Sequence, residues 1–485
     1  MKLCFYLVFF MIAFSQSDSP IISQKQLDVI DETELRAHLE FIASDELKGR
    51  ETGTDELKIA SKYLATRLKS YGFKGLGPNG SFFQDVPLIK YQYITSRSMI
   101  YYDTDKVNGV YGKDYVIYSF GIEKVNLEGD LVSVGSGIYN DSVKTYQKSD
   151  VEGKIAVRFG NPKEHDHRAV RNTLFDNGAN AVIWVIDEDT LSEKLIKAYA
   201  GYASRGQMDI DGSEENKTVY ILMTDELFNQ LNDDVTKTSV ETLEKMRIIM
   251  PSKIERLTSR NVIAYLEGSD PKLKNEYVGF GSHYDHEGIK DGEIYNGADD
   301  DGSGTVGVLQ VAKALSTNPP KRSIFINFHT AEEKGLFGSA YYAENPAFPL
   351  SQLVAMVNID MIGSYYKPNK VDIVGADRIS QDLHDINEKM NAHFTKMKLD
   401  YTYNQKGHPE RIYYRSDHYN YAKNGVPVIF YTNDNPKHYH KPSDTVETIN
   451  FKKLTRITKL ALATGYHVAN QKERIKITSP VKKEN

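Results

Sequence analysis

The chain has 485 residues, more than one ordinary hydrophobic core accommodates, so we expect at least two domains. Hydrophobic residues make up 40% of the sequence and charged residues 26%, a balance typical of globular proteins and not of disordered ones. The formal net charge is -6, so the overall charge does not favour nucleic acid or an anionic membrane as a partner.

The first 17 residues have the pattern of a secretory signal peptide. Lys2 precedes an unbroken apolar run from Leu3 to Phe14, and small or polar residues follow. This run is shorter than the roughly 20 residues that a membrane-spanning helix needs, although a retained anchor or a buried strand would show the same pattern. No second long apolar stretch follows. We therefore expect an exported protein, periplasmic or secreted, without stable membrane insertion.

The single cysteine limits the chemistry of the mature chain. Cys4 lies inside the predicted signal peptide. The mature chain would therefore have no disulfide, no thiolate ligand and no cysteine nucleophile. Any metal ion must then be held by histidines and carboxylates, which suits zinc, manganese or cobalt.

The first half of the chain contains two regions with different patterns of apolar residues. Apolar residues at helical spacing predict helices over 31–43 and 54–71, the second ended by Gly72. From about 100 to 250 the sequence is rich in short β-type runs, such as 154–158 and 181–186, with a helix expected near 167–177. We therefore divide the chain after the signal peptide into residues 18–105, 106–254 and 255–475, with a charged tail at 476–485; the resemblance described below implies that the middle stretch is an inserted, β-rich domain.

From about residue 260, strands and helices alternate. Strands are expected at 261–267, 277–282, 322–329, 353–360, 370–375 and 426–432, and helices at 303–317, 379–397, 416–424 and 451–469. Alternation of this kind predicts an α/β fold with a mixed central sheet and helices on both faces. In such sheets the functional side chains collect at the strand ends.

Two segments rich in metal-ligand residues follow the early strands of this region. His283 and Asp285 are two residues apart just after the strand at 277–282, so along an extended chain they point the same way. Residues 299–301 are three consecutive aspartates, costly to hold together unless a cation offsets their charge. The plainer alternative is an exposed acidic turn that caps the following helix.

That second segment also contains patterns that we reject. Residues 302–307 match a dinucleotide fingerprint, but the aspartates directly before them would repel a pyrophosphate, and the position twenty residues on is Asn327 instead of an acid. A calcium-binding EF-hand loop lacks its alternating acids and its final glutamate here.

Two further segments complete the set. Glu332 and Glu333 follow the strand 322–329, and a turning chain can aim one at a metal and the other at water. Asp360 closes the apolar strand at 353–360, and His440 lies in a late loop before Pro442. Each segment alone is readily explained as ordinary surface or capping chemistry. Together they provide the carboxylates and imidazoles that a two-metal hydrolytic site requires.

Other hydrolytic routes lack their motifs. The sequence has no His-Glu-x-x-His, which closes the single-zinc protease route, and no Gly-x-Ser-x-Gly, which weakens a serine hydrolase.

The segments resemble the co-catalytic dizinc aminopeptidases, the family of bacterial leucyl aminopeptidases and glutamate carboxypeptidases, with the transferrin receptor as a distant relative. The motifs that carry this likeness are Ser282–Asp285, Asn296–Gly304, Ala331–Ser339, Asn358–Gly363 and Tyr439–Thr445. Ser44–Thr54 also resembles the family's opening, and residues 106–254 are similar to a protease-associated domain.

The resemblance implies a zinc exopeptidase fold, phosphorylase/hydrolase-like, with two Zn²⁺ per chain. Asp299 would bridge the ions, with His283 and Asp360 completing one site and Glu333 and His440 the other. In addition, Glu332 would be the general base and Asp285 would orient His283. The family also implies a cis peptide bond after the bridging aspartate, expected here between Asp299 and Asp300.

Substrate contacts and the reaction itself are less sharply defined by the sequence. Residues 411–421 resemble a substrate-side loop, so Tyr413, Tyr414 or Arg415 would contact a peptide substrate, although a capped helix start fits the same residues. The resemblance favours an aminopeptidase, and Arg411 and Arg415 leave a glutamate carboxypeptidase open. The fold would also accommodate a single-zinc glutaminyl cyclase or a non-catalytic receptor-like protein, and the complete set of five ligands disfavours both.

Overall fold

The computed structural model describes residues 22–160, 166–186, 190–213, 218–232 and 235–479. The predicted signal peptide therefore lies outside the described residues. The chain divides into two compact units, unit 1 from residues 22–85 and 260–479 and unit 2 from Val86–Ser259. No helix in the described part of the chain is both long and apolar enough to cross a membrane.

The boundaries of the insertion differ from the sequence-based expectation of 106–254. Residues 86–105 belong to unit 2, because β3 (Met99–Tyr102) and β4 (Asp105–Lys106) join the sheet of that unit. The chain passes between the units inside two long strands, β2 (Phe83–Tyr93) and β12 (Ser252–Leu266). Each of these strands continues from one unit into the other. The sequence therefore does not change in character at the position where the units divide.

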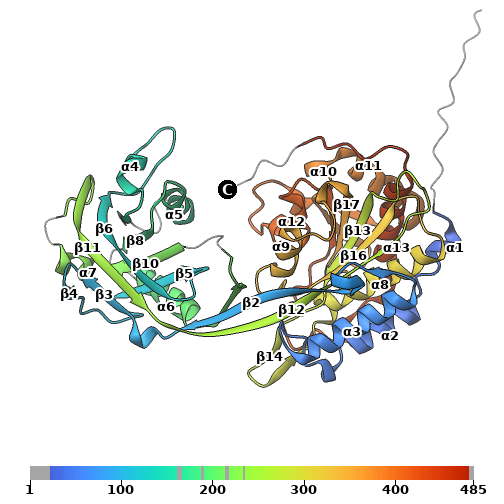
Figure 1. The fold of residues 1–485 in the computed structure, drawn as a ribbon, viewed down its shortest axis with the longest axis horizontal. Coiled ribbons are helices and arrows are strands. Elements are labelled where there is room, and N and C mark those ends of the chain that lie inside the picture. The colour runs from blue at the N-terminus through green and yellow to red at the C-terminus, as the bar shows by residue number, and fades with distance from the viewer. Residues whose placement is uncertain (1–21, 161–165, 187–189, 214–217, 233–234, 480–485) are drawn as a thin grey trace, which may run out of the picture. The chain divides into compact units, whose positions relative to one another are not determined.

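Unit 1 is built on a mixed sheet with the order β19-β18-β20-β17-β13-β16-β12. Its strands are β13 (Tyr277–His283), β16 (Ser323–His329), β17 (Leu353–Ile359), β18 (Lys370–Val374), β19 (Lys398–Asp400) and β20 (Val428–Thr432), with β1 (Lys74–Gly75) beside β12. Strand β13 runs parallel to both β16 and β17, and β17 runs parallel to β20. The carboxyl ends of four strands thus meet at one edge of the sheet (Figure 1).

Helices cover both faces of this sheet, as the alternation of elements predicts. On one face lie α1 (Gln24–Leu27), α2 (Glu32–Ile42), α3 (Asp55–Ser70), α8 (Gly304–Thr317), α11 (Gln381–Met390) and α13 (Phe451–Asn470). On the other lie α9 (Phe337–Glu344), α10 (Ala376–Ile379) and α12 (His418–Ala422). Buried strand residues alternate between the faces: Ile324 and Ile326 join the first core, and Phe325 between them joins the second.

Unit 2 has an eight-stranded sheet with the order β4-β3-β11-β6-β7-β8-β10-β5. Its remaining strands are β5 (Tyr115–Phe120), β6 (Val125–Val134), β7 (Ile155–Phe159), β8 (Ala181–Ile186), β10 (Thr218–Thr224) and β11 (Val240–Met250), and β9 (Gln207–Ile210) pairs with β2. Strands β6, β7, β8 and β10 are mutually parallel. This unit is therefore an α/β layer structure and not simply β-rich, with helices α4 (Lys148–Val151), α5 (His167–Asp176), α6 (Thr190–Ala203) and α7 (Asp225–Leu231).

Candidate metal centre

The residues singled out from the sequence converge at the carboxyl edge of the unit 1 sheet. His283 is the last residue of β13, and Glu332 and Glu333 lie in the loop after β16. Asp360 directly follows β17. The fourth parallel strand, β20, leads into the loop that carries His440. Parallel strands deliver these side chains to one place because their carboxyl ends share an edge.

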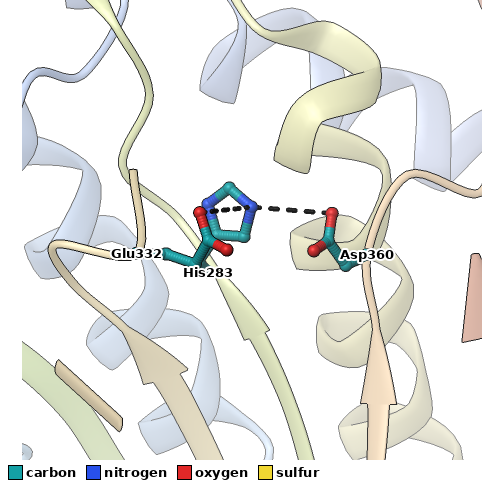
Figure 2. Close-up of side chains that lie close together, drawn as sticks. All are labelled: His283, Glu332 and Asp360. Carbon is teal, nitrogen blue, oxygen red and sulfur yellow. Dashed lines mark ion pairs between the residues drawn. The ribbon is translucent and has the colours of Figure 1, made fainter. Parts of the chain in front are cut away.

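One half of the cluster centres on His283. Its Nε2 lies 3.5 Å from Oδ1 of Asp360 and 3.8 Å from Oε2 of Glu332. Figure 2 shows one ring nitrogen of His283 joined by dashed lines to the carboxylates of both Glu332 and Asp360. Asp360 is held from behind by Ser416, whose hydroxyl donates to Oδ2 at 2.7 Å. The other oxygen, Oδ1, has no hydrogen-bond partner among the described residues and faces the histidine.

The other half centres on His440. Its Nε2 lies 3.2 Å from Oε2 of Glu333 and 3.1 Å from Oδ2 of Asp300. The opposite oxygen of Asp300, Oδ1, lies 3.3 Å from Nε2 of His283. One carboxylate therefore faces a histidine on each side and joins the two halves of the cluster.

This arrangement corrects the assignment of the shared aspartate by one residue, because Asp299 does not face either histidine. Its carboxylate accepts hydrogen bonds from the backbone N–H of Gly363, from Asn435 and from Ser303. Asp301 also turns away, and accepts from the backbone N–H groups of Gly304 and Met361. The cis peptide bond lies between Asp300 and Asp301, and not between Asp299 and Asp300 as expected.

The three aspartates therefore have three separate environments, and all are buried. Asp301 caps the start of α8, as the plainer interpretation of the acidic turn predicts, but the turn is not exposed. A fourth carboxylate, Asp444, accepts from the backbone N–H groups of Asp299 and Asp300 and so fixes the turn. Backbone donors that hold the turn in place leave Asp300 free to face the histidines.

Asp285 contacts His283 differently from the prediction. Nδ1 of His283 lies 3.1 Å from the backbone oxygen of Asp285 and 3.9 Å from its carboxylate. The carboxylate instead accepts from the Thr52 hydroxyl at 2.9 Å and from the backbone N–H of Glu332 at 3.2 Å. Asp285 thus orients the histidine with its carbonyl and holds the Glu332 backbone with its side chain.

Burial and mutual charge shift the ionisation of the cluster. Burial alone would lower the pKa of His283, but the carboxylates of Glu332 and Asp360 outweigh it and raise that pKa well above its usual value. Burial likewise opposes the charged form of His440, yet its close contacts with the carboxylates of Asp300 and Glu333 raise its pKa to about 10. Burial, together with the charges of Glu333 and Asp360, raises the pKa of Glu332 well above normal. The carboxylates therefore favour a positive charge within the site.

Strained backbone surrounds the cluster. Ala331, Met361 and His440 all have φ between 50° and 58°, a left-handed conformation uncommon for residues other than glycine. Each is either a residue of the cluster or the direct neighbour of one. Such strain costs of order 1–3 kcal/mol per residue and concentrates at functional sites.

Buried Arg50 joins two of the loops that carry the cluster. Its guanidinium donates to the carbonyl oxygens of Tyr284 and Asn296 at 2.9 and 2.6 Å, and to those of Ile42 and Gly297. It thereby connects the loop after β13 to the aspartate turn. Sequence reasoning assigned Arg50 no role, although it lies inside the segment 44–54.

The residues of the cluster fit a metal centre. Three groups of ligand atoms each lie within 4.8 Å of one another: His283, Glu332 and Asp360; His286, Asp300 and Glu333; and Glu287, Glu333 and His440. All the ligand atoms are nitrogen or oxygen, which suits zinc. Several of these buried atoms, including Oδ1 of Asp360 and Oε1 of Glu333, have no hydrogen-bond partner among the described residues. Buried polar atoms normally have a bonding partner, and a bound cation would be that partner here.

A cavity of about 380 Å³ opens beside the cluster. Its wall includes Tyr366, Tyr403, Glu410, Ile412, Arg415, Phe430, Asp434 and Tyr439, in addition to the cluster residues. Arg415 lies in this wall. Tyr413 and Tyr414 are absent from it, and Tyr413 is buried in the core beside α10 and α12.

Comparison with known proteins identifies the same region. Residues 261–465 match the family described as Peptidase family M28. The chain is 34% identical over 179 residues to the probable leucine aminopeptidase 2 of Aspergillus oryzae, a match that covers 36% of this chain and 34% of that protein. The chain thus spans about a third of the length of this relative.

Two solved structures share the fold over nearly the whole chain. An aminopeptidase from Aneurinibacillus sp. strain AM-1 is 20% identical, with a TM-score of 0.55 over 95% of this chain and 99% of that one. BSAP, a zinc aminopeptidase from Bacillus subtilis, is 17% identical, with a TM-score of 0.50 over 92% and 98% of the two chains. At these identities the likeness concerns the fold.

Proposed function

We propose, from the match of residues 261–465 to peptidase family M28, that this chain is a zinc-dependent exopeptidase that removes N-terminal residues from peptides. The observation that carries the proposal is the position of Asp300. Its two carboxylate oxygens lie 3.3 Å from His283 and 3.1 Å from His440. A carboxylate shared in this way is what a centre with two metal ions about 3.5–4 Å apart requires.

Two Zn²⁺ would be held around Asp300. His283 and Asp360 would bind one ion, and Glu333 and His440 the other. The structural neighbour BSAP, named as a zinc aminopeptidase, and the sulfur-free donor set both support zinc. When bound, zinc supplies Lewis acidity that polarises a carbonyl group and lowers the pKa of water.

Glu332 is the general base of this proposal. Its carboxylate lies beside His283 and faces the cavity, and its backbone is fixed by Asp285. It would accept a proton from the attacking water and return it to the leaving amine nitrogen as the peptide bond breaks. The neighbouring Glu333 faces His440 instead. The turn of the chain between the two glutamates would therefore let Glu332 accept the proton while Glu333 binds a metal ion.

The charge of the cavity favours a free amine over a terminal carboxylate. Apart from the four carboxylates of the cluster, the described wall carries two acidic side chains, Glu410 and Asp434, and one arginine. That arginine, Arg415, donates to the hydroxyl of Tyr439 at 3.1 Å and lies 3.8 Å from Glu410. A carboxypeptidase needs an accessible cation for the chain end, and among the described residues of this wall Arg415 is the one arginine or lysine, with Glu410 beside it. The acidic wall suits the ammonium group of an N-terminal residue.

Two further parts of the proposal rest on sequence. The apolar run at Leu3–Phe14 supports export to the periplasm or the exterior. The segments 150–157 and 177–183 support the identification of unit 2 as a protease-associated domain that restricts substrates to chain ends.

The test combines metal analysis with a matched pair of substrates. We expect two Zn²⁺ per chain and hydrolysis of a leucine-derived chromogenic amide with a free amine, but not of its N-acetylated form. Glu332→Gln should keep both ions and lower kcat about 10²- to 10⁴-fold, because the proton acceptor is lost.

Glu344→Gln is the control, since this exposed carboxylate ends α9 and does not line the cavity. It should retain the metal and most of kcat. One zinc per chain would instead favour a cyclase-like enzyme. Equal cleavage of the acetylated substrate, or full activity of Glu332→Gln, would contradict the aminopeptidase mechanism.

A further inference from the structure

His286 lies at the centre of the cluster, although the proposed function gives it no role. It follows His283 by three residues in the loop after β13, and it is fully buried. Its backbone N–H donates to the carbonyl of Arg50 at 3.1 Å. Its ring packs against Gly297, where an added Cβ would lie 2.5 Å from two ring carbons. The imidazole is therefore held rigidly in place.

The ring nitrogens of His286 are not satisfied by the surrounding protein. Neither has a hydrogen-bond partner among the described residues, and the same is true of Oε1 of Glu333. Yet Nδ1 of His286 lies only 2.7 Å from that oxygen, and 4.0 Å from Oδ2 of Asp300. Three buried ligand atoms thus converge without bonding to one another, although a buried polar group without a partner is costly.

A hydrogen bond between His286 and Glu333 would be the simpler explanation. It requires the carboxylate oxygen to lie in line with the ring N–H, and the contact does not meet this condition despite its length. Instead, the ring nitrogen of His286 and the oxygens of Glu333 and Asp300 are arranged as ligands around one point, which a metal ion would occupy. His440 faces the same two carboxylates from the opposite side, with its ring centroid 5.7 Å from that of His286.

We propose that Nδ1 of His286 is a further ligand of the metal ion held by Glu333, Asp300 and His440. This inference rests on the metal centre of the proposed function and extends it. That ion then has four protein ligands, two imidazoles and two carboxylates, which fills the usual coordination of zinc. The ion beside His283 and Asp360 has three and keeps a position next to Glu332.

The two ions consequently differ in their roles. A closed set of four protein ligands is typical of structural zinc, and a set of three with an open position is typical of catalytic zinc. The ion near His286 is bound more tightly and is removed last by a chelator. Chemistry at the cavity then depends mainly on the ion beside Glu332.

Cobalt substitution tests the ligand directly in the unaltered protein. Each histidine bound to Co²⁺ gives a strongly shifted, exchangeable imidazole N–H resonance in proton NMR. With two Co²⁺ per chain we expect three such resonances, from His283, His286 and His440. His286→Asn should remove one resonance and weaken zinc binding at one site at least about 10-fold in a chelator competition.

His438→Asn is the matched control, because this histidine lies two residues from His440 and contacts Ser443 instead of the cluster. It should leave all three resonances and the zinc affinity unchanged. Two resonances from a chain carrying two Co²⁺ would overturn the role of His286 and leave the proposed function intact. Failure to bind two ions would overturn both, and the unaltered protein gives this answer even where His286→Asn does not fold.

Discussion

The two units of this molecule have similar cores and different strand ends. Each contains four parallel strands with apolar clusters on both faces of the sheet. In unit 1 these strands lead into His283, Glu332, Asp360 and the loop of His440. In unit 2, β6 and β7 end at Val134 and Phe159, each followed by glycine. All three metal-capable groups found among the described residues belong to unit 1.

This difference shows that the layered sheet supplies a place for a site but not its chemistry. Several charged residues buried in unit 1, among them His283, Asp300 and Asp360, gather at one edge, where a cation can offset them. Among the described residues of unit 2, the buried charged side chain is Arg158, whose guanidinium stacks on Trp184. We therefore expect unit 1 to depend on metal and unit 2 to depend on its apolar core.

The largest effect should come from removing the charge that joins the two halves of the unit 1 cluster. Asp300→Asn should weaken the binding of both ions and lower kcat/KM about 10⁴-fold, because several kcal/mol of metal-dependent stabilisation is lost. Asp299→Asn is the matched neighbour and should keep both ions. It should instead cost about 1–3 kcal/mol of stability, since buried backbone donors lose a charged acceptor.

Zinc content, kinetics and urea denaturation of the two variants distinguish these outcomes. Loss of zinc from Asp299→Asn with zinc retained in Asp300→Asn would return the shared position to Asp299.

A core substitution in unit 2 should affect stability without affecting metal. Phe228 is fully buried and packs edge-on against Phe159, with 5.4 Å between the two ring centroids. Phe228→Ala should lower the free energy of unfolding of unit 2 by about 3–5 kcal/mol. Trp184 is the only tryptophan and lies in this unit, so its fluorescence during urea denaturation reports the change.

Phe280→Ala provides the corresponding change in unit 1, because Phe280 is fully buried in β13. It should reduce zinc retention, and Phe228→Ala should not. Loss of zinc from the Phe228 variant would break the proposed independence of the two units.

The most localised effect should follow metal removal without any substitution. Free zinc at 100 times its Kd stabilises the fold that holds it by about 2.7 kcal/mol. Chelation should therefore reduce hydrogen-exchange protection at the ends of β13, β16 and β17, and leave β7 and β8 of unit 2 unchanged. Uniform loss of protection across both units would argue against a metal confined to unit 1.

Much of the fold could be predicted from the sequence because its signals are local. Apolar runs bounded by loops located β13, β16, β17 and β20 to within one or two residues. Gly72 has a φ of +84° after α3, as expected for a residue that ends a helix. The extent of unit 2 was less accessible, because β2 and β12 cross between units without a break.

The same distinction, between local signals and contacts made only in the folded chain, applies to the candidate site. Ligand types after strand ends are visible in the sequence, and they indicated His283, Glu333, Asp360 and His440. Adjacent aspartates, by contrast, present the same chemistry, so Asp299 and Asp300 could not be distinguished without knowing which one Gly363 and Asn435 engage. His286 had no local signal, since its significance lies in contacts with Glu333 and Asp300, 47 and 14 positions away in the sequence.

The sequence by itself determined which elements form, which side chains end the strands, and that those side chains carry nitrogen and oxygen atoms able to bind a metal. These properties depend on neighbours along the chain and on residue chemistry. Only the tertiary structure decided which aspartate faces both histidines, that Tyr413 belongs to the core, and that His286 reaches the cluster. Each of these depends on the direction of a side chain within a turn, and distant backbone donors set that direction when the loops meet.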